Sequence, residues 1–216
     1  MRYVFLGLMC AFAVSYASIK FKGSLAARIA LKSIASICFV MIAFVARLDA
    51  PQPYFTLILM SLCLSLAGDV LLVLPGTASL AAGGSVFLLA HMGFIAAFFV
   101  YSPLSWIDAA LWIGFAVLAA VLFMGKTNGL GRLKPFIFIY AFVLSALAAK
   151  AIQMLFVRDV NPTCAAFAAL GGMLTVLSDA ALGYARTSPG ENRGMSVFAT
   201  LSYYAAQAFL ALSVVL

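Results

Sequence analysis

Two aspartates lie inside long apolar stretches of this sequence, where ionised side chains are rare. Asp69 is in the stretch 54–74 and Asp179 is in the stretch 163–184. An ionised carboxylate inside a membrane costs about 2.5–3.5 kcal/mol on insertion scales. Small and polar residues precede each aspartate at helical spacing: Ser61, Ser65 and Gly68 before the first, and Gly172, Thr175 and Ser178 before the second. Small residues favour close helix packing, but packing requires no charge, so both aspartates are candidate functional residues.

A pair of carboxyl groups can divide the work of an acid and a base. One that keeps its proton can protonate a substrate, while an ionised partner stabilises the resulting cation. Such a pair suits a hydrolysis that passes through an oxocarbenium-like cation, as in glycosidases. It would equally suit a proton-coupled transporter of small solutes or lipids. Each aspartate lies about five residues, roughly 7 Å, from the same end of its predicted helix. This position favours hydrolysis, because transporter sites usually lie at the midplane.

Other polar residues lie on the predicted helices near the two aspartates. His91, the single histidine, is either a satisfied interior side chain or part of a site. The last apolar stretch carries a polar stripe that includes Tyr203 and Gln207, which faces partner helices or a wet cavity. Lys32 could reach the membrane interface or a lipid phosphate, and Lys150 could extend outward along its helix.

The sequence offers little for metal or nucleophilic catalysis. One histidine and no clustered cysteines cannot supply the three or four ligands of a zinc site. Ser178, His91 and Asp69 could form a triad by residue type, but no nucleophile elbow surrounds the serine. The four cysteines are isolated in apolar stretches and form no CxxC pair, which is typical of small buried hydrophobic residues. We therefore expect no metal and no cofactor.

The composition requires most of this chain to lie in lipid. Of its 216 residues, 66% are hydrophobic and 9% are charged, and the mean hydropathy is +1.17. Soluble domains have about 45–50% apolar and about 25% charged residues, so a soluble globule, a disordered chain and a secreted disulfide scaffold are excluded. The net charge of +7 comes mainly from loop residues that set membrane topology, so we expect no nucleic-acid partner.

Charged residues, prolines and glycines divide the chain into eight apolar stretches that we expect to form membrane helices. They are 3–18, 28–46, 54–74, 80–100, 104–124, 135–156, 163–184 and 195–215. Continuous apolar stretches exclude a transmembrane barrel, whose strands are short and alternate in polarity. The sequence predicts one all-α, polytopic transmembrane domain over residues 1–216. We expect the first stretch to be an uncleaved helix rather than a signal peptide, because the rest of the chain is also membrane-embedded.

Charges between these stretches predict the orientation of the helices. One side holds most of the basic residues: Lys20, Lys22, Arg28, Lys126, Arg132, Lys134, Arg186 and Arg193. The opposite side holds Arg2, Arg47 and Arg158 together with Asp49, Asp108 and Asp159. The positive-inside rule places the first set in the cytoplasm and both termini outside. Because the loops are short, we expect a bacterial inner membrane.

The two halves of the sequence are weakly similar. Residues 64–72 (LSLAGDVLL) align with residues 174–182 (LTVLSDAAL), an offset of 110 residues that is close to half the chain. The chain could therefore consist of two four-helix repeats in the same orientation, with the third and seventh helices parallel to each other.

The motifs around the aspartates resemble those of the YhhN/TMEM86 family of membrane proteins. The first signature is matched by residues 65–72 (SLAGDVLL), followed by Gly84, Phe87 and His91. The second is matched by Gly171 and Gly172, residues 178–182 (SDAAL) and residues 203–207 (YYAAQ). The chain departs from the family at Phe94, where a tyrosine is common, and at Ser33, where proline often follows the lysine.

The resemblance implies a lysoplasmalogenase, a hydrolase that cleaves the vinyl ether bond of 1-alkenyl lysophospholipids without a metal or cofactor. The products would be a fatty aldehyde and glycerophosphoethanolamine or glycerophosphocholine. On this interpretation Asp69 and Asp179 are the catalytic pair, and the partners are the lysophospholipid substrate and membrane lipid. Five residues would bind substrate or water: His91, Ser178, Tyr203, Gln207 and Lys32. The departures at Phe94 and Ser33 bear on substrate preference.

Overall fold

The computed structural model describes residues 1–46, 52–123, 134–158, 160–187 and 192–214, which form helices and short connections without a strand. The helices are α1 (Arg2–Ile19), α2 (Leu25–Ala46), α3 (Gln52–Val73), α4 (Thr77–Tyr101), α5 (Trp106–Phe123), α6 (Lys134–Gln153), the short η2 (Met154–Phe156), α7 (Pro162–Thr187) and α8 (Arg193–Leu212). Seven of the described helices are long and apolar enough to cross a membrane, and α5 contributes a shorter apolar helix. The chain is therefore a multi-pass membrane protein.

The helix bounds confirm the eight predicted stretches to within three residues at every end. Local chemistry explains where several helices begin. Gly76 precedes α4 with a φ of 105°, which residues with a Cβ rarely adopt. Pro162 opens α7, where its missing N–H is not needed. Asn192 caps α8, because its side chain accepts a hydrogen bond from the backbone N–H of Met195.

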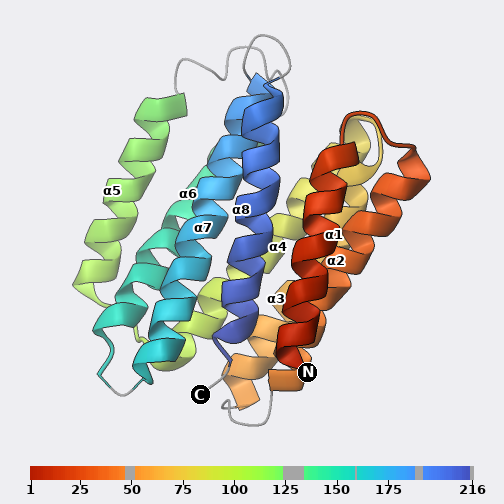
Figure 1. Ribbon diagram of the computed structural model, residues 1–216. Helices are drawn as coiled ribbons and strands as arrows, with labels where there is room; N and C mark the ends of the chain where they lie inside the picture. The colour runs from red at the N-terminus through yellow and green to blue at the C-terminus, as the bar shows by residue number, and fades with distance from the viewer. Residues whose placement is uncertain (47–51, 124–133, 159, 188–191, 215–216) are drawn as a thin grey trace.

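The helices alternate in direction and lie side by side in one bundle (Figure 1). Consecutive helices form antiparallel pairs, of which α3 with α4 and α7 with α8 are the most extensively packed. Helix α8 also packs against α1, α2 and α3, and α6 packs against α4. Helices α1 and α2 lie at one edge of the bundle, and α5 packs against α6 at the opposite edge (Figure 1).

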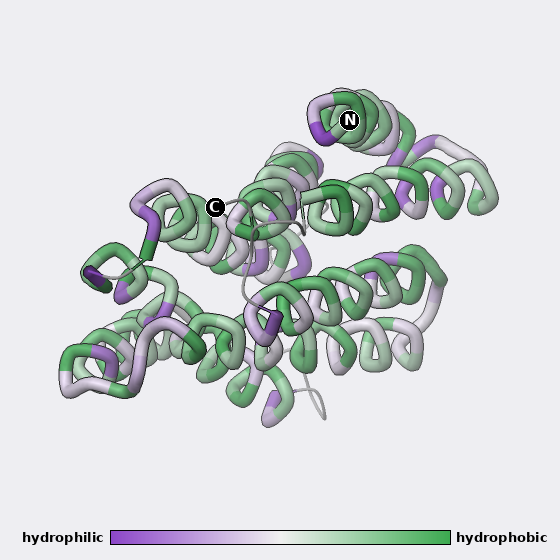
Figure 2. Tube along the Cα trace, turned by 90° about the horizontal axis from the view of Figure 1, so that it is seen from below, coloured by the Kyte–Doolittle hydropathy of each residue, from purple (hydrophilic) through white to green (hydrophobic). Residues whose placement is uncertain are grey.

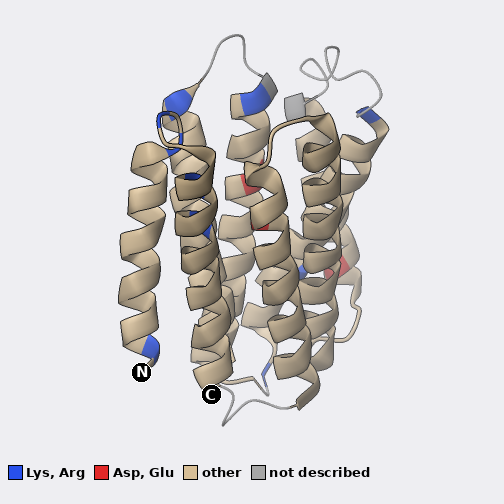
Figure 3. Cartoon of the chain, turned by 90° about the vertical axis from the view of Figure 1, so that its right-hand side faces the viewer, with Lys and Arg blue, Asp and Glu red and all other residues tan. Residues whose placement is uncertain are grey.

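Charge is distributed unequally between the two ends of the bundle. Both termini lie at one end, and most of the described Lys and Arg residues lie toward the other (Figure 3). The separation of charge that predicted the orientation is therefore present along the described chain. Five of the residues used in that prediction lie outside the described residues: Arg47, Asp49, Lys126, Arg132 and Asp159. The assignment of the basic end to the cytoplasm stays a prediction.

The order of helix pairing is the same in both halves of the chain. Helices α1 and α2, and likewise α5 and α6, pack on each other, as do α3 with α4 and α7 with α8. Helices α3 and α7, which carry the two aspartates, run in the same direction (Figure 1). The two-repeat architecture is compatible with this arrangement and remains a prediction.

Apolar side chains cover the bundle, and small residues let its interior helices approach closely. Hydrophobic positions dominate every helix (Figure 2). A Cβ at Gly68 would lie 2.7 Å from the ring of Phe87 on α4. A Cβ at Gly171 would lie 2.9 Å from the backbone nitrogen of Leu210 on α8. These glycines therefore allow α3 to pack closely on α4, next to Asp69, and α7 to pack closely on α8, about two turns before Asp179.

Candidate active site

The carboxylate of Asp69 is buried among donors from α2 and α8. The Nζ atom of Lys32 lies 3.0 Å from its Oδ1 atom. The hydroxyls of Ser36 and Tyr203 donate hydrogen bonds to Oδ2, at 2.6 and 2.8 Å. The side chain of Asp69 is 1% exposed, so an unpaired charge would be costly at this position. One ammonium group and two hydroxyls give the carboxylate a nearly complete set of partners.

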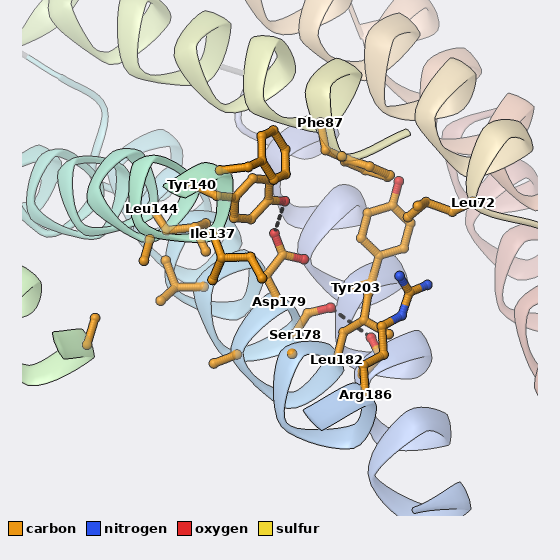
Figure 4. A pocket seen from close by; sticks show the side chains of 18 of the residues that line it. Leu72, Phe87, Ile137, Tyr140, Leu144, Ser178, Asp179, Leu182, Arg186 and Tyr203 are labelled. Atoms are coloured by element: carbon orange, nitrogen blue, oxygen red, sulfur yellow. Dashed lines mark hydrogen bonds between the residues drawn. The ribbon is translucent and has the colours of Figure 1, made fainter. Parts of the chain in front are cut away.

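Asp179 has a different environment. The hydroxyl of Tyr140 on α6 donates to its Oδ2 atom at 2.6 Å (Figure 4). The Nε2 atom of His91 on α4 lies 3.6 Å from the same oxygen, just beyond hydrogen-bond length. Within the described chain no Lys or Arg lies within ion-pair distance of this carboxyl group. Its side chain is 13% exposed, so it is the more accessible of the two acids.

The two aspartates do not lie equally far from the ends of their helices. Helix α7 continues to Thr187, three residues beyond the predicted end. Asp179 therefore lies eight residues, about 12 Å, from the end of α7. Asp69 lies four residues, about 6 Å, from the end of α3 at Val73. The prediction that both lie about five residues from a helix end is wrong for Asp179.

Both aspartates nevertheless line a single cavity of about 870 Å³. This volume lies within the range of about 300–1,000 Å³ that is usual for small-molecule sites. Its polar lining residues, which we call the polar wall, come mainly from α1 and the residue after it, α2, α3 and α7: Tyr16, Lys20, Lys32, Asp69, Asp179 and Arg186. Its apolar lining residues, which we call the apolar wall, come mainly from α4, α5 and α6 and include Leu80, Phe87, Phe115, Phe136, Ile137 and Leu144. The cavity therefore fits an amphipathic molecule.

The apolar part of the cavity includes exposed residues of α5 and α6. Leu118 and Ile139 line the cavity, and they are 51% and 56% exposed. In a membrane, this surface contacts acyl chains. An alkyl chain bound in the cavity could therefore extend into the surrounding lipid.

Two basic side chains line the cavity without a carboxylate partner among the described residues. The Nζ atom of Lys20, just beyond the end of α1, donates to the carbonyl oxygen of Ser196 at 3.0 Å and to Oγ1 of Thr200 at 2.8 Å. Burial, reinforced by the charges of Lys32 and Arg186, lowers the pKa of Lys20 to about 7. Arg186 is an exposed residue whose side chain lines the same cavity as Tyr203 (Figure 4).

The structure brings most of the predicted site residues to the cavity wall. Lys32, Ser178 and Tyr203 line it together with both aspartates. The hydroxyl of Ser178 donates to the carbonyl oxygen of Ala199 at 2.8 Å, which ties α7 to α8. Lys32 pairs with Asp69, and the expectation that it meets a lipid phosphate stays a prediction.

His91 and Gln207 do not line the cavity. Both are buried, at 1% and 0% exposure. The Nε2 atom of His91 is near the carboxyl group of Asp179, which lines the cavity, and the ring of His91 packs edge to face on Tyr140. The expectation that His91 and Gln207 bind substrate or water stays a prediction, and neither side chain is among the residues that line this cavity.

Of the two possibilities left open for Lys150, extension to the membrane interface or a place in the interior, the structure shows the interior one. Its Nζ atom lies 3.1 Å from Oδ2 of Asp108 and donates to Oγ of Ser102 and the carbonyl oxygen of Pro103. The residue is 2% exposed. The connection between α4 and α5 and the first turn of α5 supply these oxygen atoms, so the ammonium group finds its partners inside the protein.

Several residues of the site were not found from the sequence. Tyr140 and Ser36 lie on α6 and α2, which carry no aspartate, and nothing in the sequence links them to Asp179 and Asp69. Lys20 and Arg186 were interpreted only as topology signals. The available clue was that the topology prediction placed both on the same side of the membrane as the nearer ends of the aspartate-bearing helices.

The fold and the cavity define a polytopic helical membrane protein with a carboxylate pair facing a lipid-accessible cavity. More specifically, the chain belongs to the YhhN family, whose family model matches residues 27–214. The match covers α3, α4, α7 and α8, which carry the motifs around the two aspartates. No curated protein and no solved structure matches the chain significantly.

Proposed function

We propose that this protein is a membrane hydrolase that cleaves the vinyl ether bond of 1-alkenyl lysophospholipids. The observation that carries the proposal is that two carboxyl groups with different partners face one amphipathic cavity. The YhhN family is consistent with this activity. The polar wall would hold the head group and the reacting bond, and the apolar wall would hold the alkyl chain.

The different partners of the two aspartates suggest different roles. Asp69, paired with Lys32, would remain ionised and stabilise a cation. Asp179 has one hydroxyl donor, no nearby ammonium group and more contact with the cavity. It would carry the proton that is transferred to the substrate, as the general acid.

The reaction would proceed in three steps. Asp179 protonates the β-carbon of the vinyl ether, and the double-bond electrons form the new C–H bond to give an oxocarbenium ion. A water molecule then adds to the carbon attached to the ether oxygen and returns a proton to Asp179, which yields a hemiacetal. Finally the hemiacetal carbon–oxygen bond breaks, the hydroxyl proton is lost and the departing oxygen is protonated. The products are an aldehyde and a glycerol hydroxyl.

Lys20 and Arg186 are the best candidates for binding the phosphate. An ammonium group has three N–H donors, and Lys20 uses two of them on Ser196 and Thr200. The third donor can therefore reach an anion in the cavity when the amine is protonated. Arg186 offers a planar set of donors that suits phosphate oxygens. Lys32 is less suitable, because Asp69 already binds it.

The test is aldehyde release from a 1-alkenyl lysophospholipid by the purified protein in detergent. Asp69→Asn and Asp179→Asn should each reduce turnover by roughly 100-fold or more, since each removes a proposed catalytic group. Asp108→Asn is the matched control, because it makes the same change at a buried aspartate outside the cavity. Activity is normalised to the folded fraction of each variant.

Two results would overturn the proposal. Near-normal turnover in both cavity variants would exclude the carboxylate mechanism. No aldehyde from folded wild-type protein would exclude the substrate. In that case pH-dependent flux across vesicles containing the protein would test proton-coupled transport by the same pair.

A further inference from the structure

Helices α3, α4, α7 and α8 each carry a buried polar residue four positions, or about one turn, from a residue of the site. Ser65 precedes Asp69 by four residues on α3, and Thr175 precedes Asp179 by four residues on α7. His91 follows Phe87 by four residues on α4, and Gln207 follows Tyr203 by four residues on α8. All of these second-turn residues, which we call the polar layer, are at most 1% exposed: Ser65, His91, Thr175 and Gln207.

The contacts around the cavity place two members of this layer opposite each other. The rings of Phe87 and Tyr203 are in edge-to-face contact, with centroids 5.7 Å apart. Helices α4 and α8 run in the same direction (Figure 1). Residues four positions further along each helix lie on the same faces. His91 and Gln207 therefore lie one turn below the Phe87–Tyr203 contact, at the same level.

Polar atoms of the layer lack partners. Within the described chain Nδ1 of His91 and both amide atoms of Gln207 are buried without a hydrogen bond. The hydroxyls of Ser65 and Thr175 donate to carbonyl oxygens of their own helices, at 2.9 Å each. Their oxygens can still accept hydrogen bonds from another molecule. An unpaired buried amide or imidazole costs about 1–3 kcal/mol for each group, so these atoms require a polar partner.

Water is the partner that this chemistry fits. The layer offers both donors and acceptors, and its members include no carboxylate, lysine or arginine. A buried water typically forms about three hydrogen bonds, and the layer provides enough groups to hold at least one. The layer also meets the site, because Nε2 of His91 lies 3.6 Å from Oδ2 of Asp179. None of its members lines the cavity.

We propose that the polar layer is a buried water site that supplies the hydrolytic water to Asp179 from behind the cavity. The existence of the site stands on the layer alone, whereas its role in hydrolysis rests on the proposed function. The alkyl chain and glycerol of a bound lipid would displace water from the cavity itself. Water held in the layer would remain available, and after its addition to the oxocarbenium ion its proton would pass to Asp179. His91 and Gln207 act as positioning residues for this water.

Radiolytic hydroxyl labelling tests the site without measuring activity, because radicals formed from a bound water oxidise the side chains next to it. In the wild-type protein in detergent, His91 should be oxidised despite its burial. Phe98, which is fully buried in the apolar core, should remain unmodified as the internal control. Gln207→Met, which keeps the side-chain size but removes both polar atoms, should lower the oxidation of His91 by about 5-fold or more.

The matched control is Gln153→Met. Gln153 on α6 also has a buried side-chain oxygen without a partner among the described residues, but it is near Ser105, away from the cavity. This variant should leave the oxidation of His91 unchanged. An unlabelled His91 in the wild type, or equal labelling in Gln207→Met, would overturn the water site.

Steady-state kinetics then tests the role of the site. Gln207→Met should lower kcat by about 10-fold or more with KM changed by less than about 2-fold, because the residue does not touch the cavity. Gln207→Glu, which can still hold water, should recover part of kcat. Equal loss in kcat for both variants, or a change confined to KM, would overturn the role. Labelling without any aldehyde release would leave the water site standing and refute the proposed function instead.

Discussion

The ion pair between Lys32 and Asp69 offers the sharpest test of the site. In Lys32→Met the carboxylate of Asp69 would lose its ammonium partner while remaining 1% exposed. Breaking one side of a buried ion pair costs about 3–5 kcal/mol. For a chain of this size, 1 kcal/mol corresponds to roughly 2–4 °C, so Tm should fall by about 6–20 °C. The loss should be at the lower end, because the hydroxyls of Ser36 and Tyr203 still bind the carboxylate.

A second substitution separates charge from packing. In Lys32→Met with Asp69→Asn the buried charge is gone on both sides. Replacing both partners of a buried pair is often neutral, so Tm should return to within about 5 °C of the wild type. Aldehyde release should be lost in this double variant, as in Asp69→Asn alone, because the cation-stabilising carboxylate is missing. In the double variant, Tm should therefore recover while aldehyde release does not.

Thermal unfolding in detergent, followed by fluorescence, measures these effects. Lys22→Met is the matched control, because Lys22 is an exposed residue after α1. It should leave Tm unchanged. If Lys32→Met unfolds at the wild-type temperature, the pair does not stabilise the fold. If the double variant is no more stable than Lys32→Met, the loss arises from packing of the lysine side chain rather than from an unpaired charge.

Four further substitutions have expected outcomes. Tyr140→Phe removes the 2.6 Å hydrogen bond to the carboxyl group of Asp179 and should lower kcat by roughly 10-fold in the aldehyde assay. An unchanged kcat would show that this hydrogen bond does not contribute to catalysis. Lys150→Met leaves Asp108 buried and unpaired, so Tm should fall by about 6–20 °C, with KM unaffected in the remaining folded protein. Gly68→Ala places a Cβ 2.7 Å from an aromatic ring and should destabilise the protein by about 1–3 kcal/mol; an equally stable variant would mean that α3 and α4 can separate freely. The pKa of Lys20 is lowered to about 7, so its charge is lost as pH rises through 7 and KM for the substrate should increase. Lys20→Arg, in which the side chain is always charged, should remove this pH dependence of KM between pH 6 and 8. A wild-type KM that does not change with pH in this range would contradict the phosphate role.

The sequence by itself determined the membrane helices and the residues that are out of place in them. Transfer into lipid is a sum over successive residues, so a run of apolar residues predicts a span wherever it occurs. The same sum marks Asp69 and Asp179 as costly, which made them candidates before any contact was known. The alternating direction of spans then placed α3 and α7 parallel to each other.

Only the tertiary structure decided which side chains meet. Lys32 pairs with Asp69 across 37 positions of sequence, and Tyr140 reaches Asp179 from another helix. The sequence allowed Lys150 to extend outward, but in the structure it pairs with Asp108 in the interior. These pairings depend on the rotation and tilt of each helix, which side-chain packing against several neighbours sets together. Hydropathy is insensitive to such rotation, because it counts a residue equally whichever way it faces.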